Sequence, residues 1–395
     1  MGSTGHGPLH GVRVVELAGI GPGPFAAMLL ADLGADVVRV DRPGGPGLGV
    51  DPARDLTNRN KRSVVLDLKS AAGAAAALDL AGRADILVEG YRPGVAERLG
   101  VGPEQCLARN PRLVYGRMTG WGQDGPLART AGHDIGYVAV TGALGMIGPA
   151  GGPPAVPANL LGDYAGGSLY LVVGVLSALQ HARSTGEGQV VDAAIVDGTA
   201  HLTSMIHAML AAGAWQDRRG ANLLDGGAPF YGVYETADGQ YMAVGALEPA
   251  FYEEFVRLLG LSGAGTGTEA GTGTGTGTGA LPDRSDPAAW DELRALLAAR
   301  FRTRTRAEWT EVFAGSDACV APVLSLREAP DHPHLAARGT LAEHHGTVQP
   351  APAPRFSATP GAVRRPPPRP GADAAEVARD WHLTDLPAAP TQEER

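Results

Sequence analysis

Three residues with acid or base side chains stand beside glycines in loops that precede predicted helices. His133 lies in the stretch Gly-His-Asp-Ile-Gly-Tyr at 132–137, and Asp163 lies in Gly-Asp-Tyr at 162–164. Glu248 follows Gly-Ala-Leu in a third loop. An imidazole titrates near neutral pH, and burial can raise the pKa of a carboxyl group into the same range. The three residues predict an acid–base site, assembled from separate segments, that transfers protons at carbon.

Short β-branched segments alternate with helical segments over the first half of the chain, which is typical of an α/β fold with a parallel sheet. We expect strands at 12–17, 36–41, 64–68, 85–89, 113–118 and 189–194. Helices are expected at 25–33, 70–81, 164–182 and 195–215. These elements predict a large Rossmann-like domain.

The first βαβ segment, at 12–41, resembles a dinucleotide-binding site because its turn at 19–23 is rich in glycine. However, Pro24 replaces the third glycine of that fingerprint, and Pro22 lacks the backbone N–H that a pyrophosphate needs. We therefore predict a tight strand-to-helix turn rather than a nicotinamide site.

Four arginines are expected at or near the carboxyl ends of these strands, where ligands of open α/β sheets bind. They are Arg39, Arg42, Arg62 and Arg92. Guanidinium groups match phosphate oxygens in shape and charge. The sequence therefore predicts a polyphosphate pocket at this edge of the sheet.

The pattern changes near residue 225. Segments 230–236 and 240–245 flank an Ala-Asp-Gly turn and predict a β-hairpin. We expect a large domain over 1–225, a smaller α+β domain over 226–325, and a return segment with a Pro-rich, extended tail over 326–395. The Gly-Thr repeat at 265–279 is interpreted as a flexible surface insertion without a catalytic part.

Bulk properties narrow the class of protein. The net charge of −9 disfavours nucleic acid and anionic membranes as partners. Cys106 and Cys319 give no disulfide framework, and the histidines at 332–345 are too irregularly spaced to predict a metal site. The most apolar stretch, 168–179, is short for a membrane span. We expect a cytoplasmic protein.

The chain resembles the family III CoA-transferases and, within them, the α-methylacyl-CoA racemases. The superfamily resemblance rests on the stretches at 11–17, 31–41, 89–94, 188–192 and 316–323. The racemase-like stretches are 132–135, 162–164 and 245–249. The Gly-Thr repeat departs from the family pattern but lies away from these motifs.

This resemblance implies an interlocked homodimer that binds an acyl-CoA substrate and uses no other cofactor. His133 and Asp163 match the two bases of the racemases, and Glu248 matches the acid that pairs with the histidine, here from the partner subunit. The implied CoA contacts are Arg39, Arg62, Gly90, Arg92 and Tyr137.

Three hypotheses follow. The first is epimerisation of a 2-methylacyl-CoA thioester, whose α-proton is a weak acid that needs a positioned base and a second acid on the opposite face. The second is CoA transfer between carboxylic acids through an aspartyl anhydride on Asp163. The third is a protein that keeps the fold but only binds CoA or a nucleotide. His133 and Glu248 favour the first, whereas the identity of the acyl group is not encoded in these motifs.

Overall fold

The computed structural model describes residues 7–45, 50–261, 281–383 and 386, so the predicted Gly-Thr insertion at 265–279 lies outside the described residues. The chain divides into two compact units. Unit 1 comprises 1–143, 157–204 and 330–395, and unit 2 comprises 144–156 and 205–329.

The sequence predicts a domain boundary near residue 225. In the structure, the long segment of unit 2 begins earlier, directly after Ser204. The segment predicted as one long helix over 195–215 consists of two helices, α7 (Ile195–Leu202) and α8 (Ser204–Ala211). Between them, the Thr203 hydroxyl donates to the carbonyl oxygen of Ala200 at 2.7 Å. The division between the units falls at this break.

Unit 1 contains a six-stranded sheet of order β3-β2-β1-β4-β5-β6, and every pairing is parallel. The strands are β1 (Arg13–Leu17), β2 (Asp36–Asp41), β3 (Arg62–Val65), β4 (Ile86–Glu89), β5 (Val114–Thr119) and β6 (Gln189–Ala194). Strand order reverses between β1 and β4, which is where open α/β sheets bind ligands. The predicted α/β fold with a parallel sheet is confirmed.

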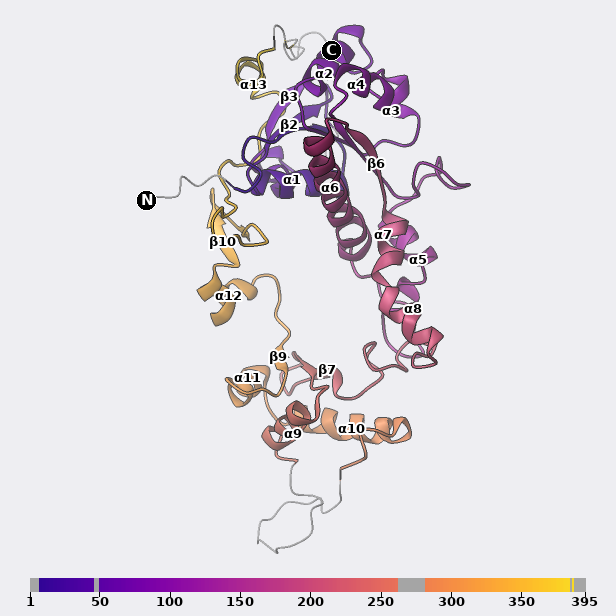
Figure 1. Ribbon diagram of the computed structural model, residues 1–395. Coiled ribbons are helices and arrows are strands. Elements are labelled where there is room, and N and C mark those ends of the chain that lie inside the picture. Colours follow the sequence, from indigo (N-terminus) through magenta and orange to yellow (C-terminus); the bar gives the residue numbers. More distant parts are fainter. Residues whose placement is uncertain (1–6, 46–49, 262–280, 384–385, 387–395) are drawn as a thin grey trace, which may run out of the picture. The chain divides into compact units, whose positions relative to one another are not determined.

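Each face of the sheet is covered by its own hydrophobic core, because successive strand residues point to opposite faces. In β1, Val14 packs in one core and Val15 in the other. The first core holds α1 (Pro22–Asp32) and α6 (Tyr170–Thr185), which lie side by side (Figure 1). The second holds α2 (Ala71–Ala81), α4 (Pro103–Arg109) and α13 (Ala374–Asp380).

Shorter elements complete unit 1. They are η1 (Pro52–Arg54), η2 (Leu56–Asn58), α3 (Val95–Arg98), α5 (Asp134–Val140), the π-helix η4 (Leu160–Leu169), η6 (Ala329–Asp331, at the boundary), α12 (Pro333–Arg338), β10 (Leu341–His344) and β11 (Thr347–Pro350). The C-terminal segment is more ordered than predicted. Its helix α13 brings Val377 and Trp381 into the core, where both are fully buried.

Helices η4 and α6 run continuously over Leu160–Thr185. By length and composition this is the one helix among the described residues that could cross a membrane. Its Leu171, Val175 and Leu179 are buried against the sheet. The helix is therefore part of the core of unit 1.

Unit 2 is built on an antiparallel three-stranded sheet, β7 (Tyr231–Glu235), β8 (Tyr241–Gly245) and β9 (Val320–Pro322). Its helices include α8, α9 (Pro249–Leu258), α10 (Trp290–Phe301) and α11 (Arg306–Phe313), with short turns at η3 (Leu144–Met146) and η5 (Pro287–Ala289). Aromatic rings of Phe255, Phe301 and Trp309 pack in its core.

Candidate active site

A cavity of about 310 Å³ opens at the carboxyl ends of β1, β4 and β5 in unit 1. Its walls come from the β1–α1 loop, the loop after β4, the loop after β5, the start of α5, and η4. Both His133 and Asp163 line it, together with Gly21, Gly90, Arg92 and Tyr137. The fold thus brings the two predicted bases to one cavity at the topological switch point.

The sequence predicts that Asp163 precedes a helix. In the structure it lies within the first turn of the π-helix η4. A π-helix is rare and often occurs at functional sites. Gly162, the residue before Asp163, has to be a glycine because a Cβ there would lie 2.4 Å from Asp134 Oδ1. This close approach lets Asp134 Oδ1 accept a hydrogen bond of 2.6 Å from the backbone N–H of Asp163. The segment carrying Asp163 is therefore tied directly to α5.

The surroundings of Asp163 raise the pKa of its carboxyl group above the usual value. Burial raises its pKa, and the nearby charge of Asp134 raises it further, against a hydrogen bond from Asn159 and the charge of His133. Asn159 Nδ2 donates to Asp163 Oδ2 at 3.3 Å. The second oxygen of Asp134 is buried without a hydrogen-bond partner among the described residues. A half-buried acid with an elevated pKa is suited to hold a transferable proton.

His133 is the N-cap residue of α5, but its side chain makes no capping hydrogen bond. The imidazole is exposed and belongs to the cavity wall. It lies close enough to Asp163 for its charge to lower the pKa of that carboxyl group. Because the side chain does no capping work, it is free to contact a ligand.

Tyr137 forms a buried wall of the same cavity. Its ring meets Trp121 edge to face, with 4.7 Å between centroids. A Cβ at Gly120 would overlap the Tyr137 ring at 1.9 Å, so this glycine gives the ring its space. Burial raises the pKa of the Tyr137 phenol, the charge of Asp163 raises it further, and Arg92 opposes both.

Two further cavities adjoin this one. The first, of about 350 Å³, shares Ile20, Gly90 and Tyr91 with it and contains Arg42. The second, of about 280 Å³, shares Arg92 and Pro93 and contains Arg98 and Arg129. Within the described part of the chain, the guanidinium groups of Arg42, Arg92, Arg98 and Arg129 have no carboxylate partner. Arg98 and Arg129 were missed in the sequence because neither follows a strand directly.

The predicted placement of Arg39 and Arg62 is wrong. Arg39 lies within β2, where its buried guanidinium contacts Glu16 at 2.7 Å and Asp41 at 2.9 Å. Arg62 is the first residue of β3 and therefore lies at the amino end of the strand, bonded to Asp36 and Asp380. Neither lines the three cavities. Because both guanidinium groups are already bonded to carboxylates, Arg39 and Arg62 are not part of the proposed CoA site.

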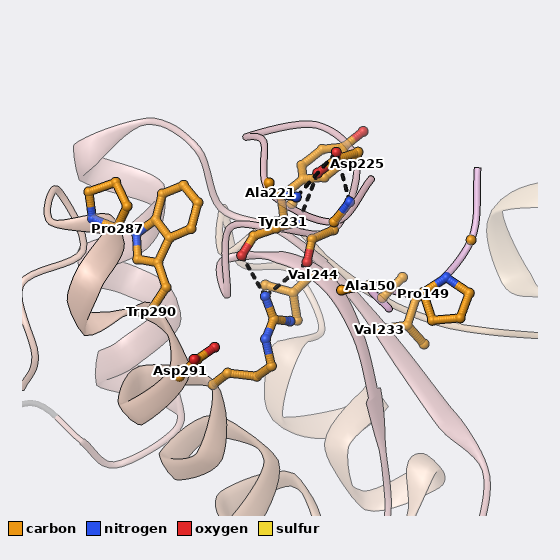
Figure 2. Close-up of a pocket in the computed structure, with 18 of the residues that line it drawn as sticks. Pro149, Ala150, Ala221, Asp225, Tyr231, Val233, Val244, Pro287, Trp290 and Asp291 are labelled. Atoms are coloured by element: carbon orange, nitrogen blue, oxygen red, sulfur yellow. Dashed lines mark hydrogen bonds between the residues drawn. The ribbon is translucent and has the colours of Figure 1, made fainter. Parts of the chain in front are cut away.

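Glu248 lies in unit 2, where it is the N-cap residue of α9. Its side chain is exposed and makes no capping hydrogen bond. Its pairing with His133 stays a prediction. The same unit contains a cavity of about 1040 Å³. Tyr231, Pro287 and Trp290 are among its lining residues (Figure 2). Gly245 and Cys319, which lie close to the Glu248 loop, also line it.

A metal site has no support in the residues that the structure describes. No group of three or more His, Cys, Asp or Glu side chains is arranged there to hold an ion.

Comparison with known proteins identifies racemases and CoA-transferases among the relatives of this chain. Human α-methylacyl-CoA racemase is 46% identical over 353 residues, which cover 89% of this chain and 87% of the racemase. The mouse racemase is 43% identical over 376 residues, covering 94% and 93%. Human succinyl-CoA:glutarate CoA-transferase is 30% identical over 388 residues, covering 94% and 86%.

A crystal structure of a CaiB/BaiF family protein from Brucella suis superposes with a TM-score of 0.78 at 26% identity, covering 95% of this chain and all of that chain. The sequence model of CoA-transferase family III matches residues 9–374. This chain therefore belongs to CoA-transferase family III.

Proposed function

We propose that this protein is an α-methylacyl-CoA racemase, which epimerises the α-carbon of a 2-methylacyl-CoA thioester by proton removal and return. The observation that carries the proposal is the presence of His133 and Asp163 in one cavity. The surrounding chain is 46% identical to the human racemase. Two different proton-transfer groups at one cavity are what inversion at carbon needs.

In the proposed reaction one proton leaves the α-carbon and another is returned to it, so the substrate keeps its composition. Neutral His133 takes the α-proton of one epimer, and the electron pair of the broken C–H bond passes into the thioester as an enolate. Protonated Asp163 then gives its proton to the opposite face of that carbon. The opposite epimer reacts in reverse, with ionised Asp163 as base and protonated His133 as acid. No electrons leave the substrate, so the reaction requires no redox cofactor.

The CoA moiety is proposed to extend across the three adjoining cavities, which share lining residues. Gly90 lines both the catalytic cavity and the cavity of Arg42, so no side chain narrows the passage at that point. Arg42, Arg92, Arg98 and Arg129 would contact phosphate oxygens, because their guanidinium groups have no carboxylate partner among the described residues. This set replaces Arg39 and Arg62 of the sequence prediction.

We further propose a cytoplasmic, interlocked homodimer with no nucleic-acid or membrane partner. Several apolar side chains of unit 1 are exposed, including Val140 at 64%, Leu160 at 63% and Val173 at 64%. The opposite side of the helix at 160–185 packs on the sheet, which argues against a membrane as the occupant of this face. A second copy of the chain would cover it and could supply Glu248 to His133.

Subunit mixing tests the contribution of Glu248. His133→Ala and Glu248→Ala should each be nearly inactive as homodimers. A heterodimer of the two variants contains one site without either change if Glu248 comes from the partner, and activity should return on mixing. If mass spectrometry verifies that heterodimers form and they are still inactive, the site is not shared between subunits.

The main experiment follows deuterium from D₂O into each epimer of a 2-methylacyl-CoA by mass spectrometry. Both epimers should gain one deuterium at the α-carbon as they interconvert. His133→Ala and Asp163→Asn should each slow interconversion about a hundredfold or more, the range for loss of a general acid or base. Interconversion without solvent label would overturn the proposal.

CoA transfer is the second candidate, because the family as a whole and a 30% identical relative point to it. In that reaction Asp163 would attack the thioester carbonyl, form an aspartyl anhydride and release CoA. Hydroxylamine would then attack one of the two carbonyl carbons of this anhydride. It would give either an acyl hydroxamate and free Asp163, or a hydroxamate on Asp163 and the free acid. Such trapping, together with a requirement for a free carboxylic acid, would favour transfer over epimerisation.

A further inference from the structure

The loop that carries Glu248 is held in place by a residue far from it in sequence, Arg284. The guanidinium of Arg284 donates one hydrogen bond of 3.4 Å to the carbonyl oxygen of Ala246 and another of 3.0 Å to that of Leu247. These are the two peptide groups immediately before Glu248. One planar side chain thus fixes the backbone that leads into the predicted catalytic acid.

The same guanidinium packs against two aromatic rings. It lies 5.0 Å from the ring centroid of Phe230 and 4.5 Å from that of Tyr252. Tyr252 belongs to α9, the helix that Glu248 begins, and the Tyr252 N–H donates to the Glu248 carbonyl oxygen at 3.0 Å. Arg284 therefore contacts both sides of the turn, the peptide groups before Glu248 and the first turn of the helix after it.

Arg284 is itself fixed by the wall of the unit 2 cavity. Its carbonyl oxygen accepts a hydrogen bond of 2.9 Å from Trp290 Nε1. Trp290 lines that cavity with Pro287 (Figure 2). The arginine is thus anchored at its backbone and at the far end of its side chain.

Glu248 does little to hold its own loop. Its carboxylate neither caps α9 nor bonds elsewhere among the described residues. Residues preferred at an N-cap, such as Ser, Thr, Asp or Asn, stabilise a helix by bonding its first N–H groups. Because Glu248 gives up that interaction, the position of its carboxylate depends on contacts made by other residues.

We propose that Arg284 is a positioning residue for Glu248, holding the loop at 246–248 so that the carboxylate can reach the imidazole of His133. This inference rests on the proposed function. Arginine is needed because its planar fork can bond two successive carbonyl oxygens while stacking on two rings. A lysine has a single ammonium group and cannot make that arrangement.

The test measures solvent exchange at each epimer separately. In the proposed reaction one epimer loses its α-proton to His133 and the other loses it to Asp163, so a defect in the Glu248–His133 pair slows exchange selectively at one epimer. Arg284→Met and Arg284→Lys should both slow that exchange about ten- to hundredfold, the scale for a displaced catalytic group. Exchange at the other epimer should change much less.

Arg300→Met is a matched control. Arg300 also belongs to unit 2, donates to a backbone carbonyl oxygen, that of Leu259, and stacks on the ring of Trp309 at 5.8 Å. It does not contact the Glu248 loop. Arg300→Met should lower the melting temperature while slowing exchange equally at both epimers, if it slows exchange at all.

Glu248→Gln separates failure of this inference from failure of the proposed function. If Glu248→Gln is selective for one epimer and Arg284→Met is not, Arg284 is only a structural residue and the inference is overturned. Full activity in Arg284→Lys would likewise overturn it. If Glu248→Gln itself shows no selectivity, the proposed role of Glu248 fails first.

Discussion

Two groups of arginines in unit 1 differ in what surrounds them. The buried group is bonded to carboxylates and comprises Arg39, Arg59, Arg62 and Arg117. The cavity group has no carboxylate partner within the described residues and comprises Arg42, Arg92, Arg98 and Arg129. From this difference we infer that an arginine near a strand end is available to bind a ligand only where the fold leaves its charge uncompensated.

Glu16 is the centre of the buried group. It accepts a bond of 2.7 Å from Arg39 and one of 2.6 Å from Lys61. The Lys61 ammonium is fully buried and also donates to Asn58 and to the carbonyl oxygen of Pro24. Burial lowers its pKa, against the charge of Glu16. Charges of this kind stabilise the fold only as long as every partner is present.

Removing Glu16 should therefore give the largest effect. Glu16→Ala leaves two buried cations without their shared carboxylate, which typically costs about 3–5 kcal/mol. We expect unit 1 to unfold at markedly lower temperature or denaturant concentration, measured by circular dichroism and calorimetry. The exposed pair Glu254–Arg257 provides the control, and Glu254→Gln should leave the transition unmoved. If Glu16→Ala were as stable as wild type, the ion pairs of the buried group would not stabilise unit 1.

The fold was predictable because its signals are local. Alternating β-branched segments indicated every strand of the parallel sheet, and β2 and β6 begin and end where expected. The errors arose where tertiary contacts decide. The helix break at Thr203 and the burial of Trp381 depend on packing against distant segments.

The site was only partly predictable. The proposed acid–base residues, His133 and Asp163, could be identified because they lie beside glycines in segments that meet at the strand ends. The arginines were harder, because their role depends on the carboxylates near them rather than on their position in the sequence. Arg39 lies three residues before Arg42, yet one is buried against Glu16 and the other lines a cavity.

Glu89 provides the next test, because it bonds Arg117 of the buried group and also adjoins the cavity loop. Its carboxylate accepts bonds from Arg117 Nε at 2.9 Å and from the Tyr91 N–H at 2.6 Å. Burial nevertheless raises the pKa of Glu89 from 4.5 to about 7. The folded protein therefore binds this proton more tightly than the unfolded chain, and stability should fall as pH rises from about 4.5 to about 7.

Glu89→Gln should reduce that fall, because the amide keeps the shape of the side chain but does not ionise. The shift corresponds to about 3 kcal/mol at 1.36 kcal/mol per pKa unit. The variant should therefore gain stability relative to wild type between pH 4.5 and pH 8, measured by urea unfolding of both proteins at each pH. A parallel pH dependence in the two proteins would show that Arg117 keeps Glu89 ionised throughout.

The cavity group should give the smallest and most specific effect. Arg42→Ala and Arg98→Ala should each raise KM for acyl-CoA about tenfold, since each removes a charge-assisted contact to phosphate, with kcat and melting temperature little changed. Added salt should raise KM for wild type more than for the variants, because screening weakens a contact that the variants no longer make. A truncated substrate, the acyl thioester of pantetheine without phosphates, should show no difference between wild type and either variant. If Arg98→Ala raised KM equally for both substrates, Arg98 would shape the cavity rather than bind phosphate, and the division into two groups would hold for Arg42 alone.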